Sequence, residues 1–105
     1  MTEDVLTVFV TVGSEEEALE ISRAVVEERL AACSSIVPGL RSIYRWKGKL
    51  CDDRELLLLM KTRASLFAPL RERIRELHSY EVPEIIGIPV TRGLREYLDW
   101  VVENT

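Results

Sequence analysis

One histidine is the residue best suited to chemistry in this 105-residue chain. His78 follows an apolar stripe that predicts a helix, and the end of that helix would favour a cationic imidazole. His78 could be a structural residue that is hydrogen-bonded to the backbone, a metal ligand or an acid–base group. A tight metal site takes about three or four ligands, and the chain has no second histidine. A site at His78 would therefore use a neighbouring subunit, a cysteine or nearby carboxylates, namely Glu81, Glu84, Asp52 or Asp53.

Two aromatic residues form a second candidate site. Tyr44 and Trp46 are two positions apart on a predicted strand, so they point to the same side of it. Such a pair is typical of a subunit contact, because Tyr and Trp combine a large apolar area with a polar tip. The same pair could instead form a stacking wall for a ligand at a subunit boundary.

The strand end Lys61-Thr62 and the segment around Glu84 complete the candidates. Lys61 and Thr62 fit the end of a strand and the entry to a helix, but Lys61 could also attract an anion to the start of that helix. Glu84, directly after Pro83, could pair with Lys61 or with an arginine. Tyr80 lies in the loop between these elements, and we count it with the ligand or interface candidates.

Known catalytic motifs are missing from the sequence. There is no GxGxxG, GxxxxGK[ST], GxSxG or HExxH pattern. Ser79 follows His78, but no other residue marks it as a nucleophile. We therefore predict a protein that is not an enzyme.

Composition excludes several other functions. The net charge is -4, and basic residues alternate with acidic ones, which argues against nucleic-acid binding. No apolar run approaches the roughly 20 residues of a membrane helix, and the acidic start, residues 1–4, does not resemble a signal peptide. Cys33 and Cys51 lack CxxC spacing and should be reduced. We predict a cytoplasmic protein.

The elements that must position these residues follow from hydrophobic periodicity. The order β-α-β-β-α-β with an added C-terminal helix predicts a single α+β domain, residues 1–105, of ferredoxin-like arrangement. The expected strands are 5–12, 33–46, 50–61 and 84–91. The expected helices are one from Glu15 to about residue 31, one carrying Phe67 to Leu77 with Ser65 as its cap, and a short one from Leu94.

Local signals refine these boundaries. Ser14, three residues before Glu17, predicts a capping box. Pro38-Gly39 indicates a bulge or bend, and Lys47-Gly48-Lys49 indicates a tight turn. Pro69 should lie in the first turn of its helix, and Pro89 suggests either an edge position or a break in the pairing of its strand.

The run Leu56–Met60 is apolar at every position, so both faces of its strand should be dry. Val8–Val10 and Ile85–Ile88 share this pattern. Two helices cover only one face of such a sheet, and each exposed large aliphatic side chain forfeits roughly 1.5–3 kcal/mol. We therefore predict that copies of the chain cover the other face. Three copies in cyclic symmetry suit a wedge-shaped sheet, while two copies remain an alternative.

Several segments, in order along the chain, resemble the CutA divalent-cation tolerance proteins. The resemblance covers nearly the whole sequence. The matching segments are Glu27–Cys33, Ser35–Lys49, Leu59–Thr62, His78–Glu84 and Tyr97–Trp100.

The resemblance implies a ferredoxin-like fold assembled as a homotrimer through its sheets. It also implies a cytoplasmic role in tolerance to copper or other divalent cations, with metal binding. Relatives often have Asn at Ser35 and Pro at Ser79. Some carry a cysteine and a second histidine at positions that here hold Val10 and Leu77, so only His78 carries over as a metal ligand.

Three functions follow as hypotheses. The first is a trimeric metal-responsive protein without turnover. The second is a sensor similar to the PII signalling proteins, binding a small anionic metabolite near Lys61, Tyr44 and Trp46. The short turn Lys47–Lys49 argues against it, because PII proteins have a long mobile loop there. The third, a hydrolase of the acylphosphatase kind, lacks a phosphate-cradling loop.

Overall fold

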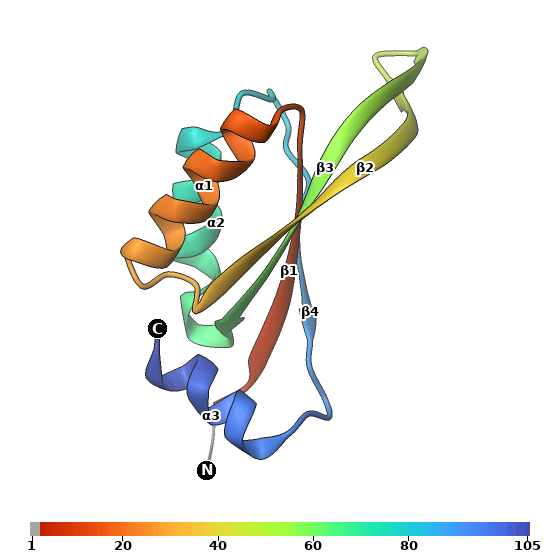
Figure 1. Ribbon diagram of the computed structural model, residues 1–105. Helices are drawn as coiled ribbons and strands as arrows, with labels where there is room; N and C mark the ends of the chain where they lie inside the picture. Colours follow the sequence, from red (N-terminus) through yellow and green to blue (C-terminus); the bar gives the residue numbers. More distant parts are fainter. Residues whose placement is uncertain (1–2) are drawn as a thin grey trace.

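The computed structural model describes residues 3–105, so Met1 and Thr2 of the predicted acidic start lie outside it. A four-stranded antiparallel sheet has the order β2-β3-β1-β4. Helices α1 and α2 cover one of its faces, and α3 lies at one end (Figure 1). The predicted α+β, ferredoxin-like arrangement with an added helix is confirmed. The elements are β1 (Val5–Val12), α1 (Glu15–Glu27), β2 (Cys33–Trp46), β3 (Lys49–Arg63), a 3-10 turn (Ala64–Leu66), α2 (Phe67–Leu77), β4 (Ile85–Pro89) and α3 (Arg95–Glu103).

The two ends of α1 illustrate one correct and one wrong boundary. Ser14 caps the helix as predicted, because its side chain accepts a hydrogen bond of 3.2 Å from the Glu17 N–H. The helix ends at Glu27, however, and not near residue 31. The backbone turns left-handed at Arg29, with φ 60°. The apolar pattern continued beyond the helix because Ala31 is itself fully buried in the core.

The predicted cap of α2 is also wrong. Ser65 lies inside the 3-10 turn, and Leu66 stands at the cap position without a side-chain hydrogen bond. The Ser65 N–H instead donates to the Glu3 carboxylate at 2.8 Å. Pro69 is the third residue of α2, so its predicted place in the first turn is confirmed.

The strands keep their predicted order but differ in length, since β3 is longer than expected and β4 is shorter. Pro89 belongs to β4, which pairs only with β1 and forms an edge, as predicted. The register of β2 on β3 shifts between Val37 and Leu40, which confirms the bulge. Lys47 and Gly48 both have positive φ, 49° and 79°, the geometry of a tight two-residue hairpin turn.

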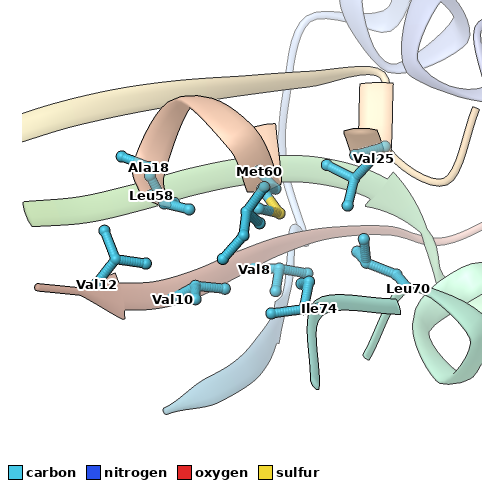
Figure 2. Packing of buried hydrophobic residues seen from close by; sticks show 11 residues of the cluster. Val8, Val10, Val12, Ala18, Val25, Leu58, Met60, Leu70 and Ile74 are labelled. Carbon is cyan, nitrogen blue, oxygen red and sulfur yellow. The ribbon is translucent and has the colours of Figure 1, made fainter. Parts of the chain in front are cut away.

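The main core lies between the sheet and the two long helices. Figure 2 shows side chains from β1, β3, α1 and α2 packed together there. Alternation along β3 places Leu58 and Met60, both fully buried, on this covered face. A smaller cluster under α3 joins Val5, Ala32 and Val101.

The opposite face of the sheet, which we call the helix-free face, is only partly covered. Leu59 and Phe9 pair across it and are half-buried. Ile86 and Ile88 on β4 keep 47% and 43% of their surface exposed. The terminal helix covers only one end, where Val101 packs into the smaller cluster. Within residues 3–105, no element covers the rest.

The far ends of β2 and β3 form a hairpin arm that extends past the helices (Figure 1). The arm gives the molecule its longest dimension, 47 Å. Near its base Arg41 and Asp52 form a bidentate ion pair, with N–O distances of 2.8 and 2.9 Å. This exposed pair crosses the two strands.

Candidate functional site

A cavity of about 610 Å³ lies where the hairpin arm meets the loop that follows α2. Five residues selected from the sequence line it together: Tyr44, Trp46, Tyr80, Glu81 and Glu84. Glu55, which sequence reasoning missed, joins them from β3. Thr11 of β1 also lines the cavity, which therefore gathers residues from three strands and a loop.

The strands explain why these residues share one side. Tyr44 pairs with Cys51 in the β2–β3 register, and odd-numbered β3 residues, including Glu55, belong to the helix-free side of that strand. Tyr80 comes from the loop and passes close to Gly13. A Cβ atom at Gly13 would lie 3.2 Å from the Tyr80 hydroxyl oxygen, so glycine leaves the room that this ring needs.

A short hydrogen bond joins the loop to the strand inside the cavity. The Tyr80 hydroxyl donates to Glu55 Oε2 at 2.6 Å. Glu55 is only 7% exposed. Burial, and then the hydrogen bond to Glu55, raise the pKa of Tyr80 well above its ordinary value. Tyr80 therefore stays a protonated donor at neutral pH and fixes one oxygen of the carboxylate.

A second tyrosine makes a similar bond on the more exposed arm. The Tyr44 hydroxyl donates to Asp53 Oδ2 at 2.5 Å. This hydrogen bond, followed by burial, raises the pKa of Tyr44 to about 12. Both phenols near the cavity are thus donors, and neither is suited to proton transfer at neutral pH.

His78 lies behind the cavity and holds the loop in place. Its buried ring lies 4.7 Å from the Tyr80 ring, centroid to centroid. The Tyr80 N–H donates to Nδ1 at 3.1 Å, so the other nitrogen, Nε2, carries the proton and donates to the Thr11 carbonyl at 2.7 Å. Glu17 Oε1 lies 3.7 Å from Nδ1. Both ring nitrogens therefore already have partners.

This geometry does not provide a ready metal site within one chain. A metal needs an unprotonated nitrogen lone pair, and the only such lone pair of His78 accepts the Tyr80 N–H. Across residues 3–105, no group of three or more His, Cys, Asp and Glu side chains could hold a metal ion. A metal at His78 would have to displace this loop contact and recruit further ligands.

Lys61 and Thr62 lie away from the cavity. Thr62 is fully buried, and its hydroxyl donates to the Leu30 carbonyl at 2.7 Å, so it is a structural residue. Lys61 pairs with Thr7, which in turn pairs with Ile88. Glu84 is four positions before Ile88, about 13 Å along the strand. The predicted Lys61–Glu84 pair is therefore wrong.

Comparison with known proteins identifies the family. The model of the family described as "CutA1 divalent ion tolerance protein" matches residues 6–104. The chain belongs to this family. It is 59% identical over 98 residues to a divalent-cation tolerance protein CutA of Thermus thermophilus, covering 93% of this chain and 95% of the relative.

A solved structure gives the same result. The structure of a divalent cation tolerance protein from Thermus thermophilus superposes with a TM-score of 0.94 at 57% identity, over 96% of this chain and 98% of that one. A chloroplastic CutA of Arabidopsis thaliana is 45% identical, but the chain spans only 55% of its length. The CutA family is named for divalent-cation tolerance and not for a reaction.

The charge of the cavity bears on the alternative of a PII-like anion sensor. Three carboxylates line it, from Glu55, Glu81 and Glu84, against one ammonium, from Lys47. That ammonium lies 3.6 Å from Glu81, which already neutralises it. A cavity with this balance repels an anionic metabolite. The sequence contained a signal for Glu55, a charged residue directly before an otherwise apolar strand, but did not show what it faces.

No helix in residues 3–105 is both long enough and apolar enough to cross a bilayer.

Proposed function

We propose that this CutA family member works as a cytoplasmic homotrimer in tolerance to divalent cations, copper among them, and that it binds metal without turning over a substrate. The main observation in support of this assembly is the apolar helix-free face. It displays the half-buried Phe9 and Leu59 beside the exposed Ile86 and Ile88.

Energetics support assembly through this face. Burying a large apolar side chain fully is worth roughly 1.5–3 kcal/mol, so completing the burial of these four partly exposed residues represents several kcal/mol. That amount is comparable with the whole stability of a small domain. Tyr97 and Trp100 of α3, stacked at 5.7 Å and about 40% exposed, extend the apolar surface.

Assembly also bears on the metal. Because one chain offers no three-ligand group in its described part, a tight site needs residues from more than one copy. His78 is our proposed histidine ligand, and it would release the Tyr80 N–H on binding. Copper is the proposed metal because imidazole nitrogen suits it.

Sedimentation equilibrium tests the assembly. The wild type should give about three times the 12.0 kDa mass of one chain. Ile86→Asp should lower the mass toward one chain, because an unpaired carboxylate cannot be buried between apolar faces. Leu19→Asp is the matched control, since Leu19 is 41% exposed on α1. A wild-type mass near one chain at micromolar concentration would contradict the trimer.

Calorimetric titration with copper(II) tests the metal. His78→Gln removes the imidazole but keeps a side-chain amide N–H, close to the position of Nε2, that can donate to the Thr11 carbonyl. Copper affinity should fall about tenfold or more in this variant, because even the loss of a residue that only positions a metal ligand has an effect of this size. Equal affinity in the two proteins would show that His78 is not a ligand.

A further inference from the structure

The cavity between the arm and the loop combines two features that both favour a cation. Its walls include three aromatic side chains, Tyr44, Trp46 and Tyr80. Its polar lining is predominantly acidic, as described above. Aromatic faces and carboxylates both attract positive charge, the first through the ring quadrupole and the second directly.

Glu55 is the central group of this arrangement. It is more than nine-tenths buried and lines the cavity. One of its carboxylate oxygens accepts a hydrogen bond from the neutral Tyr80 hydroxyl. A buried carboxylate is normally paired with a cation, because a neutral donor does not compensate for the lost hydration of the charge. Lys47, the lysine that lines the cavity, pairs with Glu81 instead, and its ammonium lies 5.6 Å from the centroid of the Trp46 ring.

We propose that this cavity is a binding site for a small organic cation, an alkylammonium or quaternary ammonium compound. Glu55 supplies the counter-charge at the inner wall. Tyr44, Trp46 and Tyr80 supply the aromatic surfaces against which the alkyl groups pack. The volume of about 610 Å³ falls within the range of small-molecule sites.

The lining favours an organic cation over a bare metal ion. Divalent ions take several oxygen or nitrogen ligands at about 2.0–2.6 Å, and no three-ligand group occurs among residues 3–105. The aromatic walls offer ring faces, which attract cations but do not coordinate a metal ion. Weakly hydrated ammonium groups bind such faces well.

Calorimetric titration of the full-length protein with choline is the test, with 3,3-dimethylbutan-1-ol as the neutral probe of the same shape. Choline should bind at least about tenfold more tightly than the neutral probe. Glu55→Gln should weaken choline binding about tenfold or more and leave the neutral probe unchanged. Trp46→Ala should weaken choline binding about two- to fivefold.

Two controls separate binding from folding. Glu27→Gln makes the same charge change on the exposed surface of α1 and should leave choline affinity unchanged. Glu55→Gln keeps an oxygen that can accept the Tyr80 hydroxyl, and it removes an uncompensated charge. Its melting temperature should therefore equal or exceed that of the wild type.

Three results would overturn the proposal. The first is no choline binding to the wild type at millimolar concentration. The second is equal choline affinity in the wild type and Glu55→Gln. The third is a Glu55→Gln variant that melts earlier and loses assembled mass, because Glu55 would then pair with a cationic side chain of another copy. None of these results depends on whether copper binds at His78.

Discussion

Two adjacent residues of β3, Leu58 and Leu59, have the same side chain and opposite surroundings. Leu58 is fully buried under α1 and α2, within the cluster of Figure 2. Leu59 points to the helix-free face and is half-buried between its strand neighbours Phe9 and Ser35. The contrast shows that one chain can complete one face of this sheet and not the other.

The polar groups on the two faces also differ in how far a single chain supplies their hydrogen-bond partners. On the covered face hydroxyls are paired inside the chain, as Ser22 with Ser34 at 2.8 Å and Thr62 with the Leu30 carbonyl at 2.7 Å. On the other side of β3, Glu55 faces a cavity with a single neutral partner. The helix-free side therefore carries the groups that remain available to ligands and to other copies.

The largest expected effect comes from truncating the two leucines. Leu58→Ala should lower the free energy of unfolding by about 2–5 kcal/mol at every protein concentration, because it leaves a cavity in a closed core. Leu59→Ala should cost only about 1 kcal/mol in dilute solution, since its side chain is only partly buried there. At higher concentration its cost should grow as other copies cover the face. Urea unfolding over a range of concentrations measures both.

Equal losses for the two variants at every concentration would remove the distinction between the faces. A larger loss for Leu59→Ala in dilute solution would reverse it. Unfolding slopes should match the wild type in both variants, so that the midpoints report stability alone.

A smaller effect is expected from two threonines on opposite faces. Thr62→Val should cost about 1–3 kcal/mol, because the buried Leu30 carbonyl loses its donor. Thr7→Val, on the helix-free side of β1, should change stability by no more than about 0.5 kcal/mol. Thermal unfolding at one protein concentration compares them. A Thr7→Val variant as unstable as Thr62→Val would mean that the helix-free face is closed in the single chain.

The sequence predicted most of the fold because its signals were local. The alternation in β3, the Ser14 cap, the bulge at Pro38-Gly39 and the edge position of Pro89 each follow from a few neighbouring residues. The errors have equally physical causes. The end of α1 was placed too late because Ala31 is buried after the helix has ended, and periodicity alone cannot separate those cases.

The site was harder to predict because it depends on register. Tyr44 and Trp46 were paired correctly from strand alternation, and both line the cavity with Tyr80 and Glu84. Nothing local indicated that Glu55 faces the same space, since that follows from the pairing of β2 with β3. The bond of His78 to the Tyr80 N–H agrees with the backbone-bonded alternative, whereas its bond to Thr11 was out of reach because Thr11 is 67 residues away in the chain.

The smallest expected effect comes from the exposed arm, where Tyr44 donates to Asp53. The hydrogen bond raises the pKa of Tyr44 to about 12 in the folded chain, against about 10 in an unfolded one. Because the folded value is higher, the stabilisation is complete below about pH 10 and is lost as the pH rises toward 12. Tyr44→Phe should therefore melt slightly below the wild type at pH 8, and the difference should shrink between pH 10 and 12. In Asp53→Asn, absorbance at about 295 nm should show Tyr44 ionising closer to pH 10, whereas an unchanged titration would assign the shift to the surroundings of the ring instead of Asp53.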